Sequence, residues 1–271
     1  FAPDGIQLGQ SAYATELVRR WGLDTCRPTQ TPSEAELYPL APEPPDGEAT
    51  RTCQELLGGL LWLSCRTRPD IAMVVSHYSS YATSAPHQAL VGLKRIVRYL
   101  AGTTGLGLWF RPWEDGDMMT AQRTAYFNDL RERRGVPPFE NRPGAVCVHA
   151  FGDASFAPAT RTKPDSSSSS SSKGQSSSSS SSSSLSPHAD CRSITGVAIV
   201  VAGSLVSWRS TKQSTTASST AEAETTAQVA TLHSAQGLAA MLQELSLDAQ
   251  VLLHADNTAQ LAIVAKPNHR T

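Results

Sequence analysis

The sequence predicts an α/β chain in which a mainly helical first part precedes a mixed sheet with flanking helices. Three observations lead to this prediction. Apolar residues recur at helical spacing through residues 53–101, β-branched strands begin near residue 146, and a helix–strand–helix succession ends the chain. A run of strands followed by helix–strand alternation is typical of a mixed sheet covered by helices.

The first part is expected to hold four helices, with Ser11 as cap and Gly22 as end of the first one. Pro69 and Pro86 stand where two later helices would begin, since proline fits the first turn of a helix. Residues 28–47 are rich in proline and acidic residues and read as a connector. The helices, and a closing strand, are expected over residues 11–22, 53–65, 70–83, 87–101 and 105–110.

The second part alternates strands and helices after a spacer or insertion at residues 111–145, in which 117–134 has the pattern of a polar helix. Two serine runs, 166–172 and 176–184, lie in an insertion of about 162–190. Such a tract buries too little apolar area to offset its ordering entropy, so we expect it to be disordered. The expected strands are 146–152, 194–202, 205–209 and 250–255, and the expected helices are 219–245 and 257–265.

Composition narrows the function classes. The 271 residues suggest one or two domains, and the formal net charge of -1 gives no overall basic field, so any contact with nucleic acid would come from local patches. No apolar run approaches 18 residues, so no membrane role is expected. Widely spaced cysteines without a CxxC pair indicate reduced thiols of a protein that is not secreted, and no zinc site: Cys26, Cys53, Cys65, Cys147 and Cys191.

Three carboxylates stand out by their local context. Asp153 and Asp256 each follow an apolar strand, and Glu224 lies in an otherwise uncharged Ser/Thr/Ala stretch at the start of the long helix. Scattered carboxylates usually lie on a solvated surface. If the two strands are neighbours, however, all three groups would converge and repel one another unless a cation lay between them. Hard oxygen ligands suit Mg²⁺ or Mn²⁺.

Several alternatives remain open. Glu222 lies two residues from Glu224, about 200° around a helix, so only one of them can face such a site. Nucleophilic catalysis by a Ser/His/Asp triad that includes His254 is another hypothesis, but the sequence has no G-x-S-x-G motif to form a nucleophile elbow. A third group of residues shares one side of the helix over 87–101 and could contact phosphates or form a solvated face: Lys94, Arg95 and Arg98.

Longer segments of the second part resemble the RNase H domain of copia-type LTR retrotransposons. Phe151-Gly-Asp-Ala-Ser155 resembles the segment of the first catalytic Asp, and Ala255-Asp-Asn-Thr-Ala259 that of the third carboxylate. The run after Glu224 is similar to the residues that follow the catalytic Glu, which favours Glu224 over Glu222. The other matching segments are Arg192–Gly196, Val206–Ser214 and Ser218–Glu224.

The first part resembles the region that follows the polymerase palm in the same family. The matching segments are Gly5–Tyr13, Cys26–Pro32, Leu57–Leu63, Thr67–Ile71 and Leu93–Thr103. The resemblance implies a piece of a Pol polyprotein, with a thumb/connection-like region at 1–110 and an RNase H-like domain at 146–271. The polymerase's Tyr-x-Asp-Asp motif is absent from this sequence, so DNA synthesis by this chain is not expected.

The resemblance also implies an activity. Two Mg²⁺ (or Mn²⁺) ions, roughly 4 Å apart, would serve hydrolysis of the RNA strand of an RNA–DNA hybrid. Asp153 would bridge both ions, Glu224 would hold one, and Asp256 would hold the ion on the nucleophile side. Selectivity for RNA would come from contacts to the 2′-OH. The other implied partner is the remainder of the Pol polyprotein, in a cytoplasmic virus-like particle or the nucleus.

Two departures from the family pattern qualify this activity. The serine-rich insertion helps to separate Asp153 from Glu224 by 71 residues, which a surface loop can absorb at modest entropic cost. A fourth carboxylate would follow residues 257–265, where this sequence stops, so we expect it to be missing. The alternative to a ribonuclease H is therefore an inactive retroelement remnant that at most binds nucleic acid. A third hypothesis is a host adaptor that uses the fold for protein contacts.

Overall fold

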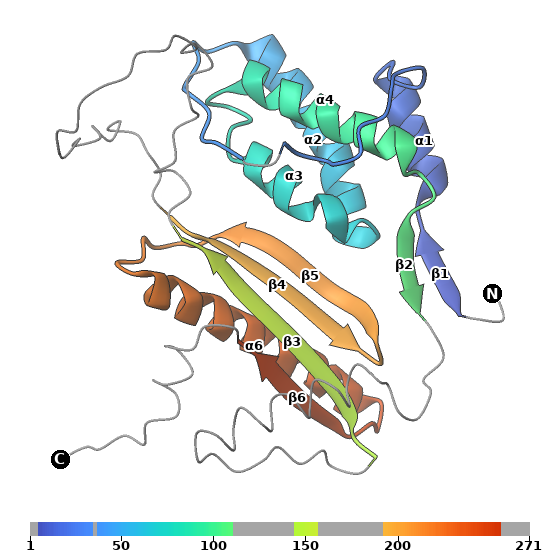
Figure 1. The fold of residues 1–271 in the computed structure, drawn as a ribbon, viewed down its shortest axis with the longest axis vertical. Helices are drawn as coiled ribbons and strands as arrows, with labels where there is room; N and C mark the ends of the chain where they lie inside the picture. The colour runs from blue at the N-terminus through green and yellow to red at the C-terminus, as the bar shows by residue number, and fades with distance from the viewer. Residues whose placement is uncertain (1–4, 35–36, 111–143, 157–191, 256–271) are drawn as a thin grey trace, which may run out of the picture.

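A computed structural model describes residues 5–34, 37–110, 144–156 and 192–255. They form a helical region (residues 5–110) and a sheet region (residues 144–255), with the sheet lying between the helical region and one long helix (Figure 1). The arrangement is a mixed α/β fold, as predicted. Several predicted features lie outside the described residues: the polar helix at 117–134, the serine-rich insertion, the helix at 257–265 and Asp256.

Four α-helices of the helical region enclose an apolar core. Their apolar residues recur at helical spacing and meet in the interior, where Leu56, Leu60, Ile96 and Leu100 have no exposed surface. The predicted spacing therefore identified the core correctly. The helices are α1 (Ser11–Arg20), α2 (Gly47–Arg66), α3 (Ala72–Ser79), which follows the short 3₁₀ turn η1 (Pro69–Ile71), and α4 (Pro86–Gly102).

The start of α2 and the N-cap of α1 differ most from the prediction. Helix α2 begins six residues before residue 53, because the Asp46 carboxylate accepts hydrogen bonds from the backbone N–H groups of Glu48 (2.9 Å) and Ala49 (3.0 Å). The prediction of Ser11 as cap of the first helix is wrong. Gln10 holds the N-cap position of α1 without a side-chain bond, and Ser11 is the first helical residue.

A two-stranded antiparallel ribbon extends from the helical region. Strand β1 (Ile6–Gly9) pairs with β2 (Gly107–Phe110), which lies within the predicted strand at 105–110. Strand β1 was not predicted, because its apolar alternation spans only four residues, all of which are exposed. Gly107 is required here, since a Cβ at this position would overlap the carbonyl oxygen of Leu8.

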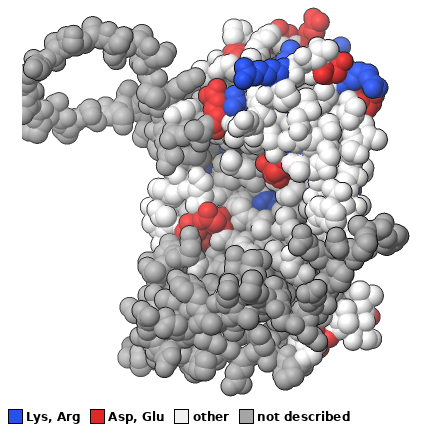
Figure 2. Space-filling view, turned by 45° about the vertical axis from the view of Figure 1, so that its right-hand side comes forward, with Lys and Arg blue, Asp and Glu red and all other residues white. Residues whose placement is uncertain are grey.

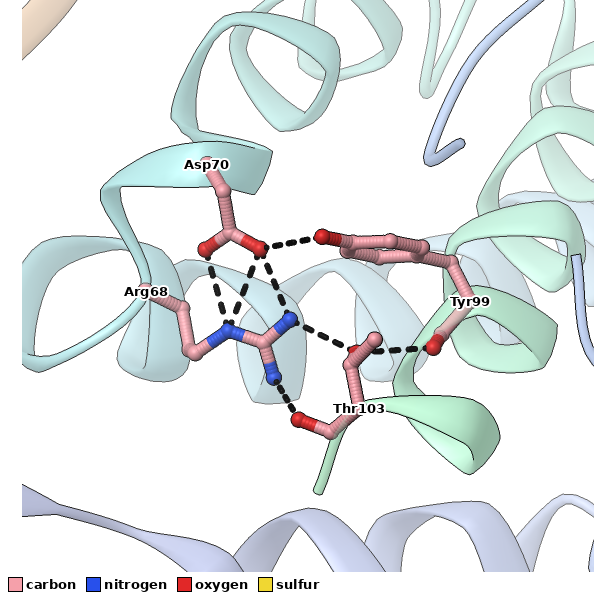
Figure 3. A network of polar contacts seen from close by, with 4 residues as sticks. All are labelled: Arg68, Asp70, Tyr99 and Thr103. Carbon is pink, nitrogen blue, oxygen red and sulfur yellow. Dashed lines mark hydrogen bonds and ion pairs between the residues drawn. The ribbon is translucent and has the colours of Figure 1, made fainter. Parts of the chain in front are cut away.

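An ion pair in the turn after α2, between the buried Arg68 and the partly exposed Asp70, is hydrogen-bonded to the end of α4 (Figure 3). The Arg68 guanidinium is 2% exposed and donates to both carboxylate oxygens of Asp70, at 2.7–3.3 Å. It also donates to the backbone oxygen and the hydroxyl of Thr103, each at 2.9 Å. The Tyr99 hydroxyl donates to Asp70 at 2.9 Å, so every group in the network has a partner.

The sheet region has four strands in the order β5-β4-β3-β6. Strands β3 and β6 are parallel, and the other neighbours are antiparallel. A hairpin joins β4 to β5 through Ala202 and Gly203, both with positive φ, one residue earlier than the predicted Gly203-Ser204 turn. The strands are β3 (Val146–Ser155), β4 (Ile194–Val201), β5 (Ser204–Lys212) and β6 (Ala249–His254).

Helix α6 (Thr220–Glu244) covers one face of this sheet, and the helical region contacts the other. Val148 and Ile199 of the sheet pack with Ala235 of α6 in the core between them. On the opposite face, the Trp208 indole N–H donates to the Ser64 carbonyl of α2 at 2.7 Å. The Lys212 ammonium lies 5.9 Å from the centre of the Tyr81 ring. The two regions are therefore in direct contact through β5.

Two further findings concern the membrane and cysteine predictions. No helix among the described residues is both long and apolar enough to cross a membrane. Cys26, Cys53 and Cys65 are free thiols, and Cys191 lies outside the described residues.

Candidate functional site at the end of β3 and β6

Asp153 lies inside strand β3, where it pairs with Gly196 of β4. The prediction that the strand ends at Gly152 is wrong by three residues, because β4 continues the ladder to Ser155. The Asp153 side chain is exposed, and its Oδ1 accepts a hydrogen bond from the Ala154 backbone N–H at 2.9 Å. A carboxylate held in a strand and open to solvent can bind a ligand without a change in the backbone.

Strands β3 and β6 are parallel neighbours, the condition under which the sequence placed Asp153 and Asp256 at one edge. Their register ends with Phe151 opposite His254, so both strands finish at the same end of the sheet. Asp256 follows His254 by two residues and lies outside the described residues, so its position stays a prediction.

Glu224 is buried at 6% exposure and lies at the same end of the sheet. Its helical neighbours Ala223 and Ala227 pack against Ala154 of β3. Side chains alternate along a strand, so Ala154 faces α6 and Asp153 faces the opposite side. The two carboxylates therefore lie at the same end of the sheet, one on each of its faces.

Gly152 and Gln228 bring α6 close to this end of the sheet. A Cβ on Gly152 would overlap the Thr231 hydroxyl and lie 3.3 Å from the Ala227 carbonyl oxygen, so only glycine permits the approach. The Gln228 amide nitrogen donates to the Gly152 carbonyl at 2.7 Å and lies 3.4 Å from the His254 carbonyl. Sequence reasoning missed Gln228, because a polar residue in a helix gives no sign of its partners.

Glu222 has a different role from Glu224. Its carboxylate is exposed and accepts hydrogen bonds from the Ser218 hydroxyl (2.6 Å) and the Ser218 backbone N–H (2.7 Å). The Ser219 hydroxyl accepts from the Glu222 backbone N–H (3.2 Å), which makes Ser219 the N-cap of α6. The Ser218 hydrogen bonds lower the pKa of Glu222. Glu222 therefore closes the helix start, whereas Glu224 faces the sheet.

The donor groups at this end of the sheet are oxygens, the ligand type that a hard divalent cation prefers, although Asp153 and Glu224 approach from opposite faces. Asp153 and Glu224 supply carboxylate oxygens, and the buried Oε1 of Gln228 has no hydrogen-bond partner among the described residues. Within the described ranges, no group of three or more His, Cys, Asp or Glu side chains gathers as a metal site. The third predicted ligand, Asp256, lies outside the described residues, so the three-carboxylate site remains a prediction.

A pair of histidines lies beside the candidate site, on the face of the sheet that bears Asp153. His149 is 8% exposed, and its Nδ1 lies 3.0 Å from Nε2 of His254. The Phe151 ring stacks on His254, with ring centres 4.4 Å apart. His254 belongs to β6, as predicted, and the pair joins β3 to β6 across the sheet. The sequence signal for this contact was a histidine within each of two apolar strands.

The predicted phosphate-contacting side chains of α4 have separate environments. Lys94 is exposed, whereas Arg95 donates to the Thr31 hydroxyl (3.3 Å) and Arg98 to the Arg27 carbonyl (3.2 Å). The two arginines thus attach the connector to α4. Figure 2 shows basic and acidic side chains interspersed over the described part of the helical region on the side in view.

Three of the curated proteins to which the chain is similar are retrovirus-related Pol polyproteins of plant transposons. The chain is 32% identical over 116 residues, 40% of its length, to "Retrovirus-related Pol polyprotein from transposon RE1" of Arabidopsis thaliana. It is 23% identical over 270 residues, 98% of its length, to the corresponding RE2 polyprotein of the same plant. It is 29% identical over 111 residues to the Pol polyprotein from transposon TNT 1-94 of Nicotiana tabacum.

These matches cover small parts of long proteins: 7%, 14% and 8% of the three polyproteins, respectively. No protein-family model matches the chain. No solved structure matches it significantly.

Proposed function

Because this chain belongs to the copia-type retrotransposon Pol polyproteins, of which it matches a short part, we propose that residues 146–271 form an RNase H-like domain that hydrolyses RNA in RNA–DNA hybrids. The supporting observation is the position of two predicted carboxylates at one end of the sheet. Asp153 is open to solvent on one face, and Glu224 is buried beneath α6 on the other. Residues 1–110 are then the thumb/connection-like region.

The environments of Asp153 and Glu224 are compatible with the roles proposed for them. Asp153 is exposed, so it is open to the two cations that it is proposed to bridge, whereas Glu224 is buried and can hold one cation in a fixed place. Asp256 is proposed as the third ligand. Bound Mg²⁺ or Mn²⁺ would supply an activated water and charge stabilisation of the leaving oxygen. Recognition of RNA would rest on its 2′-OH groups.

The test is cleavage of a labelled RNA–DNA hybrid by the full chain, with Mg²⁺ and with EDTA. We expect Asp153→Asn and Glu224→Gln to reduce cleavage to the level seen with EDTA. Glu222→Gln is the matched control, since it makes the same chemical change two residues away and should leave cleavage intact. Equal cleavage by the unaltered chain and Asp153→Asn would contradict the site. A chain that never cleaves above the EDTA level is an inactive remnant.

A further inference from the structure

Gln228 lies where three structural elements meet beside the candidate site. Its side chain comes from α6 and is 5% exposed. The amide nitrogen donates to the Gly152 carbonyl of β3 at 2.7 Å and lies 3.4 Å from the His254 carbonyl of β6. Because carbonyl oxygens only accept, the nitrogen of the amide must face them, which fixes its orientation. One side chain thus connects α6 to both parallel strands.

Two of the elements that Gln228 connects, α6 and β3, carry predicted carboxylates, and the third, β6, ends two residues before Asp256. Gly152 directly precedes Asp153, and His254 stands two residues before Asp256. Glu224 lies four residues before Gln228, on the same side of α6, where both are buried. A change in how Gln228 binds the two carbonyls would therefore alter the position of Glu224 relative to both strands.

The amide oxygen of Gln228 gives a second, independent observation. It is buried without a hydrogen-bond partner among the described residues. Buried acceptors are normally satisfied, because leaving one without a donor costs free energy. A donor bound at the carboxylate site, such as a cation-bound water, would satisfy this oxygen.

We propose that Gln228 is a positioning residue that sets the spacing between Glu224 of α6 and the strands β3, which bears Asp153, and β6, and thereby the cation affinity of the site. The proposal rests on the proposed function, because it takes these carboxylates as the ligands. Groups that orient metal ligands typically change metal affinity by about 10- to 100-fold when removed. A residue that only packs would affect stability and leave cation affinity unchanged.

The experiment compares Gln228→Leu with Thr231→Val in the full chain. Thr231 is also fully buried on α6 and contacts β3 at Gly152, but its hydroxyl donates within the helix, to the Ala227 carbonyl at 2.8 Å. Mn²⁺ affinity is measured by calorimetric titration, and the urea midpoint by circular dichroism. We expect Gln228→Leu to weaken Mn²⁺ binding by about 10- to 100-fold. Thr231→Val should lower the urea midpoint and leave Mn²⁺ affinity within about twofold.

The outcomes separate this proposal from the proposed function. Asp153→Asn identifies the Mn²⁺ that binds at the site, and hybrid cleavage by the unaltered chain tests the function on its own. If Gln228→Leu weakens the Mn²⁺ binding that depends on Asp153 and Thr231→Val does not, the positioning role is supported, whether or not the chain cleaves the hybrid. If Gln228→Leu binds Mn²⁺ like the unaltered chain, or no binding depends on Asp153, the positioning role is overturned.

Discussion

Replacement of Asp70 by alanine should destabilise the helical region strongly, because Arg68 would keep its charge without its main partner. The guanidinium is 2% exposed, and three of its hydrogen bonds end on the Asp70 carboxylate. Breaking a buried ion pair by removing one partner typically costs about 3–5 kcal/mol. Asp70 itself is 32% exposed, so water can replace part of the lost contact, and we expect about 2–3 kcal/mol.

The measurement is the free energy of unfolding in urea for Asp70→Ala, Arg68→Met and the double variant. Removing both charges leaves no buried cation, so the double variant should be more stable than Asp70→Ala by about 1 kcal/mol or more. If Asp70→Ala unfolds at the same urea concentration as the unaltered chain, or the double variant is the least stable, the reasoning about the buried charge is wrong.

The same pair predicts a dependence on pH. Burial raises the pKa of Asp70. The hydrogen bonds and charge of Arg68, together with the Tyr99 hydroxyl, lower this pKa by more than burial raises it, so the pKa lies below its ordinary value. The stabilisation is therefore present above the unfolded pKa of about 3.9 and is lost as pH falls through the lower folded pKa. Asp70→Ala should lack this loss, which thermal unfolding between pH 5 and pH 2 would reveal.

Three further predictions follow from single positions. Burial, then the nearby Lys212 charge, lowers the pKa of His77 to about 4, so stability should fall as pH decreases from about 6.5 to 4; His77→Phe should remove that slope in thermal unfolding. Ser219→Ala should cost about 1 kcal/mol in urea unfolding by removing the N-cap of α6, and an unchanged midpoint would contradict that role. Gly152→Ala should cost about 1–3 kcal/mol, because its Cβ would push α6 away from β3; equal stability would show that the helix shifts freely.

The elements that the sequence predicted are those with a repeated local pattern. Helix α4 was predicted because apolar residues recur at helical spacing after Pro86, and strands β4 and β6 because most of their residues are β-branched or apolar. Strand β1 was missed because it is short and is stabilised by pairing with β2, which lies about 100 residues away in the sequence. The early start of α2 was missed because Asp46 looked like part of the acidic connector.

The candidate site was predicted only as far as local context allowed. Both Glu222 and Glu224 were visible in an uncharged stretch, and the Ser219-x-x-Glu222 spacing was a capping signal that could have separated them. The burial of Glu224, the contacts of Gln228 and the histidine pair depend on strands that are brought together only by folding. No spacing in the sequence reports such contacts.

The hydrogen bond from Trp208 to the Ser64 carbonyl means that a residue of the sheet region caps the end of α2 in the helical region. Ser64 lies in the last turn of α2, where carbonyl groups have no partner within their own helix. The Leu63 carbonyl is satisfied by the backbone N–H groups of Thr67 and Arg68, whereas the Ser64 carbonyl accepts from an indole that is 144 residues later in the chain. The sheet region thus caps a helix of the helical region, and a chain divided between residues 110 and 146 would return that carbonyl to water.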